Sequence, residues 1–383
     1  MAFGLKKFQN LKEKTETKIT NKFYQNIIVG EDISAIATLL KLKDSCAPEK
    51  LLFIASDRFN KSLLELKLKA QLNQLRGSAL AAYFAQPTLE TMIYKNAEFK
   101  LYTEKQSLPA PFLGRESFFA KPLLSLSLEK LLSLLQIKAN DWANLDEIIA
   151  AYRQDKAVVE VKKTQENDLV NVNKWEIRCS DTQILSCENL FWAASAKKFL
   201  NYLTNKDQFH TNTLQFFQSI VETAGYSMTF SSNEKLFTEN TSVLIPQSIT
   251  HEHGYFLGEF FSENNGQEFT FQAQIHEEDF NTEELSKKIL LLKRTLQRIF
   301  EKMPANIKES IIFEENMFVD SVNDDLYFDY ATHDLDGFFF LGQCSPIAKN
   351  IREKISADEL KYFPRTLISL CQFNDSLSAP SSN

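Results

Sequence analysis

The sequence is poor in glycine, with 10 glycines in 383 residues. This share is about 2.6%, whereas a typical protein has about 7%. Glycine has no Cβ atom, so it is the residue that lets a backbone approach a ligand closely. We therefore expect no glycine-rich loop that binds phosphate.

Other features that would indicate particular functions are also missing. The five cysteines are an odd number without a CxxC pair, which argues against disulfides or structural zinc and predicts a reducing, cytoplasmic compartment. There is no run of about 18 apolar residues and no signal-peptide core, so we expect no transmembrane helix. A net charge of −7 without a basic stripe argues against a nucleic-acid partner. No G-x-S-x-G nucleophile motif occurs.

The chain does have the composition of a globular protein, with 44% hydrophobic and 24% charged residues. Its length predicts one large or two interlocked domains. Residues 1–22 contain six lysines and two glutamates, a local charge of +4. This segment is either a loosely docked helix or a basic arm that contacts a membrane surface or an unknown protein partner. Residues 373–383 are predicted to be a disordered tail.

Hydrophobic patterning predicts an α/β protein. Residues 24–30 and 50–55 are apolar strands on either side of a helix at 32–43, which implies a parallel sheet. The same patterning predicts further helices at 61–75, 121–155, 196–224 and 283–303, and a helical tail to about 372. It predicts strands within 157–194 (an antiparallel meander), 226–275, 311–332 and 337–342.

The turn after the first strand reads Gly30-Glu31-Asp32-Ile33-Ser34-Ala35. A turn that binds a dinucleotide needs three small residues, for a tight bend, for close approach of the pyrophosphate and for helix packing. Gly30 and Ala35 fit the first and third positions. Asp32 stands at the second position. Its carboxylate and a ligand phosphate about 4 Å away would be two like charges, which would repel by roughly 4 kcal/mol at an effective dielectric near 20. With Glu31 beside it, Asp32 is expected to block the groove, and its carboxylate is expected to cap the helix.

Four segments resemble the FAD-dependent amine oxidase-like flavoproteins of the FAD/NAD(P)-binding Rossmann superfamily. They are NIIVGEDISAIATLLKLK, KLLFIASDRF, ENLFWAASAKKFLNYL and DGFFFLGQCSP. The resemblance implies a discontinuous Rossmann-like domain with an antiparallel meander, plus an inserted substrate-type domain of mixed sheet and helices. The first domain would comprise 23–95, 155–200 and 330–372, and the second 96–154 and 201–329.

The chain departs from this family at the positions that would hold FAD. The acidic residue expected after the second strand is replaced by Ala55 and Ser56, with Asp57 nearby. Gln343 follows Gly342 where the family has an acid. We therefore expect a non-catalytic pseudoenzyme without FAD, which acts as a scaffold for a partner or small molecule.

Two alternatives remain open. One is an FAD-dependent oxidoreductase with a divergent site formed by Gly30, Ala35, Asp57 and Gly342. The other is a membrane-surface or complex-assembly factor that uses residues 1–22.

The remaining candidate sites are weaker. His251-Glu252-His253 would place two imidazoles on one face of a strand, but we interpret it as a loop or edge without a metal. His276-Glu277-Glu278-Asp279 is interpreted as a polar loop before a helix. Cys344 is either a buried structural residue or a reactive thiol at a helix start.

Overall fold

The computed structural model describes residues 21–68, 92–95, 98–102, 107–109, 128–164, 174–235, 241–245, 256–263, 266–275, 281–299, 308–331 and 334–349. Residues 1–20 of the predicted arm, both histidine motifs and the predicted tail lie outside these ranges. The predictions for these segments stay predictions.

The first sheet has seven strands in the order β6-β2-β1-β9-β8-β7, with β15 also paired to β9. Strand β1 pairs in parallel with β2 and β9, and β15 pairs in parallel with β9. Strands β7, β8 and β9 form the predicted antiparallel meander. The bounds are β1 (Asn21–Gly30), β2 (Leu51–Ile54), β6 (Arg153–Gln154), β7 (Val158–Lys163), β8 (Trp175–Cys179), β9 (Ile184–Ala193) and β15 (Phe338–Phe340). The predicted α/β class is confirmed as a mixed parallel and antiparallel sheet covered by helices.

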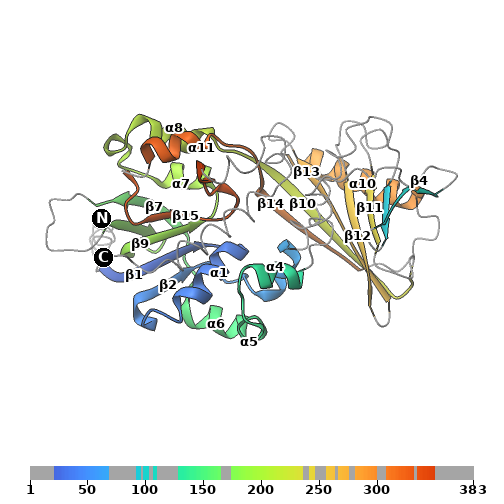
Figure 1. Ribbon diagram of the computed structural model, residues 1–383, viewed down its shortest axis with the longest axis horizontal. Helices are drawn as coiled ribbons and strands as arrows, with labels where there is room; N and C mark the ends of the chain where they lie inside the picture. The colour runs from blue at the N-terminus through green and yellow to red at the C-terminus, as the bar shows by residue number, and fades with distance from the viewer. Residues whose placement is uncertain are drawn as a thin grey trace, which may run out of the picture.

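Both faces of this sheet are buried. In β1, Ile27 and Val29 belong to one core cluster and Ile28 to the other, so alternate side chains pack on opposite faces. The two faces lie under separate groups of helices (Figure 1). One group is α7 (Ala196–Tyr202) and α8 (Thr211–Ser219). The other is α1 (Ile33–Leu42), α4 (Leu128–Leu134), α5 (Ala139–Ala143) and α6 (Leu145–Tyr152).

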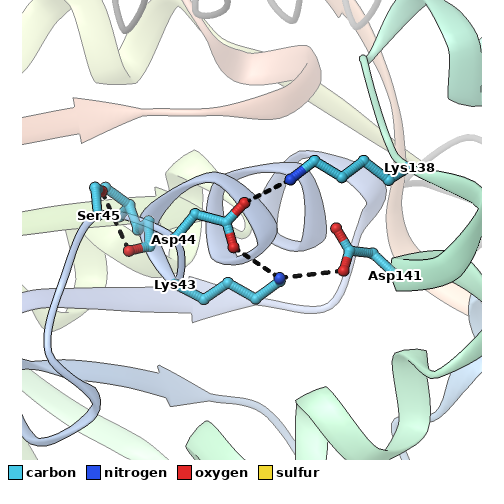
Figure 2. Close-up of polar contacts among 6 residues, drawn as sticks. Lys43, Asp44, Ser45, Lys138 and Asp141 are labelled. Atoms are coloured by element: carbon cyan, nitrogen blue, oxygen red, sulfur yellow. Dashed lines mark hydrogen bonds and ion pairs between the residues drawn. The ribbon is translucent and has the colours of Figure 1, made fainter.

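Charged side chains join the end of α1 to α5. Lys43 Nζ lies 2.9 Å from Asp44 Oδ1 and 3.1 Å from Asp141 Oδ1. Lys138 Nζ lies 2.9 Å from Asp44 Oδ2, which completes the cluster shown in Figure 2. These contacts link the end of α1 to the start of α5.

The second sheet has eight strands in the order β14-β10-β13-β12-β11-β3-β4-β5. All its pairings are antiparallel. Figure 1 shows the two sheets side by side, with β10 and β14 running from one body to the other. The bounds are β3 (Met92–Lys95), β4 (Glu98–Tyr102), β5 (Ser107–Pro109), β10 (Val221–Ser232), β11 (Thr241–Ile245), β12 (Phe256–Glu263), β13 (Gly266–Ile275) and β14 (Lys308–Ser321). Helix α10 (Thr282–Ile299) also lies in this body.

Short helical turns complete the described chain. They are η1 (Pro48–Lys50), η2 (Lys206–Gln208), α11 (Asp324–Leu326), the π-helical turn η5 (Tyr327–Ala331) and η6 (Gly342–Cys344). Strands were predicted across 311–332, whereas the structure has one long strand, β14, followed by helical turns from Asp324.

The two bodies divide the chain differently from the predicted domain boundaries. Residues 128–154 were assigned to the second domain, but Leu131 and Leu145 pack in the core that contains α1, and β6 joins the first sheet. Helix α8 also packs on the first sheet, through Phe216 and Phe217. Residues 92–95 were assigned to the first domain but form β3 of the second sheet. Each difference arises because burial partners are distant in sequence.

Among the residues that the structure describes, no helix is both long and apolar enough to cross a membrane.

Candidate functional site

A cavity of about 640 Å³ lies where the parallel strands β1, β2 and β9 end. This edge of a parallel α/β sheet is the usual place for a ligand. The lining includes the turn after β1, the ends of β2 and β9, and the start of β10. Its residues are Val29, Gly30, Glu31, Asp32, Ile54, Ala55, Ser56, Lys67, Asp155, Lys156, Ala157, Val158, Trp192, Ala193, Ala194, Ser195, Lys198, Tyr202, Glu222, Leu341, Gln343 and Cys344.

Gly30 ends β1 in a conformation that favours glycine, with φ +145°. A Cβ atom at this position would lie 2.4 Å from the carbonyl oxygen of Ala193 in β9. The first glycine of the turn is therefore needed for the close packing of β1 against β9. Ala35, at the third position, is fully buried in the core under α1.

Asp32 caps helix α1, as the sequence predicted. Its Oδ1 accepts a hydrogen bond of 2.9 Å from the Ala35 backbone N–H. Burial raises the pKa of the Asp32 carboxyl to about 6, although the bond from Ala35 and the charge of Lys67 act in the opposite direction. The carboxylate therefore takes a backbone donor that a phosphate would use at the start of a helix.

Gly342 lies directly against this cap. It has a left-handed φ of +76°, and a Cβ atom there would lie 2.6 Å from Asp32 Oδ2 and 3.3 Å from Ser34 Oγ. The glycine that follows β15 thus lets the chain fold over Asp32. Gln343 and Cys344 line the cavity beside it.

Glu31 joins the turn to the end of β2. Its Oε1 accepts a 2.6 Å hydrogen bond from the Ser56 backbone N–H, and its Oε2 lies 3.6 Å from Lys67 Nζ. Burial acts to raise the pKa of Glu31, but the bond from Ser56 and the charge of Lys67 outweigh it and hold the pKa below its ordinary value. Glu31 therefore carries a charge where an acid in a dinucleotide site binds ribose hydroxyls.

Asp57 is exposed and does not line the cavity. Its backbone N–H donates to Asp155 Oδ1 at 3.2 Å. Arg153 holds the same loop by donating to the carbonyl oxygens of Ser56, Asp57 and Phe59. Of the proposed cofactor residues, the structure thus brings Gly30, Ala35 and Gly342 together around Asp32 and leaves Asp57 outside the cavity.

Glu222, at the start of β10, is a site residue that no sequence motif indicated. Its carboxylate accepts from the Ser195 hydroxyl at 2.6 Å, the Ala196 N–H at 3.1 Å and the Lys197 N–H at 3.3 Å. The Cys344 thiol also donates to it, at 3.1 Å. A single acid next to a strand is too weak a pattern to identify Glu222 as a site residue. Its partner Ser195 does leave a local pattern, because it is the N-cap of α7.

Cys344 is 3% exposed and hydrogen-bonded to Glu222, an arrangement that suits a structural cysteine. No group of three or more histidine, cysteine or acidic side chains within the described ranges has the geometry to hold a metal ion.

The residues present do not fit the pyrophosphate of a dinucleotide. Three carboxylates of the chain, on Glu31, Asp32 and Glu222, already accept from the backbone donors at the end of β2 and at the starts of α1 and α7. An added phosphate would meet negative charge at each of these places.

No family model matches the sequence, and no curated protein matches it. Solved structures are similar to the chain only at low sequence identity and with TM-scores below 0.5. Putrescine oxidase with bound putrescine has 8% sequence identity, covers 94% of this chain and 100% of that chain, and gives a TM-score of 0.44. An oxidoreductase from Methanosarcina mazei has 9% identity, covers 92% of this chain and 100% of that chain, and gives 0.44.

A peptidyl tryptophan dihydroxylase has 11% identity and a TM-score of 0.37. That match covers 84% of this chain but 60% of the other, so this chain spans less than two thirds of that protein's length.

Proposed function

We propose that this chain is a non-catalytic relative of the flavin-dependent oxidoreductases, in which its own carboxylates occupy the positions of the FAD phosphates and ribose. The retained two-sheet framework would then serve as a scaffold for a protein partner or a small molecule. The observation that carries this proposal is that the carboxylates of Glu31, Asp32 and Glu222 accept hydrogen bonds from backbone donors around the cavity.

The electrostatics of the groove support this proposal. A helix start favours one bound anion, and Asp32 already supplies it for α1. Displacing Asp32 would cost its hydrogen bond to Ala35, and leaving it in place would put two anions in contact. A flavin dinucleotide therefore gains little from the contacts that normally hold its phosphates.

The second candidate is a flavin oxidoreductase with a divergent cofactor site. The feature that favours it is the cavity itself, which at about 640 Å³ lies within the usual size range for small-molecule sites. The position of Asp57 weakens it, because Asp57 does not line the cavity.

The two candidates predict different effects of Asp32→Gly on FAD binding. Under our proposal, added FAD leaves the thermal unfolding of the wild-type protein unchanged, and Asp32→Gly introduces a shift to higher temperature. Asp57→Ala is the matched control, because it removes a nearby carboxyl that does not line the cavity. Wild-type protein that binds FAD with full occupancy, and more weakly after Asp57→Ala, would instead support the divergent oxidoreductase.

A further inference from the structure

Three lysines line the cavity of about 640 Å³, and two of them are paired with acids. Lys67 Nζ lies 3.6 Å from Glu31 Oε2, and Lys156 Nζ lies 2.6 Å from Asp181 Oδ2. The side chain of Lys198, on α7, is exposed and has no ionic or hydrogen-bond partner among the residues that the structure describes. Lys198 is therefore the lining cation that a ligand can reach without breaking an ion pair.

Tyr202 adds a second donor to the same wall of the cavity. It lies one turn after Lys198 on α7, so both side chains lie on one face of the helix, and both line the cavity. The Tyr202 hydroxyl makes no hydrogen bond within the described ranges. Its ring packs edge-on against Trp192, with ring centroids 6.3 Å apart, and this contact holds the phenol beside the ammonium group.

The lining also includes apolar side chains that are at most 8% exposed, namely Val29, Ile54, Val158 and Leu341. Pockets for small molecules commonly combine such apolar walls with a few polar groups that fix the orientation of the ligand. A ligand that suits this cavity has an apolar body and an anionic group that reaches Lys198 and Tyr202.

The acids of the lining favour a ligand with a single negative charge. Glu31, Asp32 and Glu222 accept from backbone N–H groups of the chain. Asp155 Oδ1 accepts from the Asp57 N–H at 3.2 Å. A second negative charge on the ligand would face these acids without a further unpaired lysine in the lining. A carboxylate has one charge and two acceptor oxygens, one for each donor on α7.

We propose that the cavity binds a small organic carboxylic acid, with its carboxylate between the Lys198 ammonium and the Tyr202 hydroxyl and its apolar body against Val158 and Leu341. The inference rests on the proposed function, because a bound flavin dinucleotide would fill the same cavity.

Naphthylacetate is the probe for this site, and the neutral naphthylacetamide is its match in shape. Isothermal titration calorimetry of the flavin-free full-length protein should show the acid binding about threefold to fivefold more tightly than the amide, because an exposed ion pair contributes up to about 1 kcal/mol. The doubly charged naphthylmethylphosphonate should bind more weakly than naphthylacetate, because its second charge faces the acids of the lining.

Variants of the lining test the two donors separately. Lys198→Gln should weaken naphthylacetate binding about threefold to fivefold and leave naphthylacetamide binding unchanged. Lys197→Gln is the matched control, because it removes the same charge from an exposed neighbour that does not line the cavity. Tyr202→Phe should weaken binding of the acid more than binding of the amide. Ala157→Trp, at an exposed lining position, should weaken binding of both by filling the cavity.

Equal affinity of the wild-type protein for the acid and the amide would overturn the inference. So would unchanged affinity for the acid in Lys198→Gln, or no binding of the acid up to about 1 mM. Tighter binding of the phosphonate would overturn the assignment to a singly charged acid. Any of these results in a flavin-free protein leaves the non-catalytic assignment intact, whereas FAD bound to the purified protein would contradict the proposed function itself.

Discussion

Glu31 and Asp32 are neighbours in sequence, but their carboxyl groups are held in different ways. Glu31 accepts from Ser56 and lies near Lys67, which keeps its pKa low despite burial. Asp32 accepts from Ala35 and lies against Gly342, and burial raises its pKa to about 6. One acid therefore stays charged at any physiological pH, while the other changes its charge in mild acid.

Asp32→Asn is predicted to stabilise the protein at high pH. The folded-state pKa of about 6 is above the ordinary value of 3.8, so the folded state binds this proton more tightly and loses stability as the pH rises through about 6. Asparagine removes that penalty and keeps the cap. We expect a gain of about 1–3 kcal/mol at about pH 8 and none at about pH 4, measured by urea unfolding. An equal gain at both pH values would contradict the burial of this charge.

Gly342→Ala is predicted to destabilise the fold by about 1–3 kcal/mol, because φ is positive and the new methyl would meet Asp32. In an Asp32→Gly background the clash with Asp32 disappears, whereas the tight contact with Ser34 Oγ and the backbone strain remain. Unfolding of the two single variants and the double variant measures both parts. Strict additivity would show that the two residues do not touch in solution.

At the scale of whole elements, Glu222 connects β10 of the second sheet to the start of α7 on the first. Glu222→Ala leaves the Ser195 hydroxyl and two backbone N–H groups without their acceptor, so we expect a loss of about 2–3 kcal/mol. Ser195→Ala should cost about 1 kcal/mol as a lost cap. Chemical denaturation of the double variant should show a smaller loss than the sum of the two. Independent effects would contradict a shared hydrogen-bond network.

The charged cluster between α1 and α5 makes a matched pair of tests. The Lys138 side chain is 69% exposed, so Lys138→Ala should leave stability unchanged in high salt. The Asp141 side chain is 12% exposed and pairs with Lys43, which is also largely buried, so Asp141→Ala should cost about 1–3 kcal/mol. Thermal melts of the two variants at low and high salt separate the exposed Lys138 contact from the buried pair of Lys43 and Asp141. Equal losses would mean that burial does not set the strength of these pairs.

Local signals in the sequence were enough to predict β1, α1 and the capping role of Asp32. The apolar run, the glycine and the acid lie within a few residues of one another, and each acts on its immediate neighbours. The contact between Glu31 and Ser56 spans 25 residues, and that between Glu222 and Cys344 spans 122, so neither leaves a local pattern. The same limit explains why α4, α5 and α6 were assigned to the wrong body.

At the scale of the whole molecule, the two sheets lie side by side (Figure 1). Residues from both bodies line the cavity, with Gly30 and Asp32 from the first sheet and its turn and Glu222 from β10. A ligand or partner that bound there would contact both bodies. The scaffold role that we propose depends on the cavity being free of a flavin dinucleotide.

The absorption spectrum of the purified full-length protein tests this central claim most directly, followed by heat release and quantification of any flavin. We predict a colourless protein with no band at about 450 nm and no released FAD. A yellow protein that releases one FAD per chain would contradict the account, because the phosphates would then have to lie where Glu31, Asp32 and Glu222 bind the backbone.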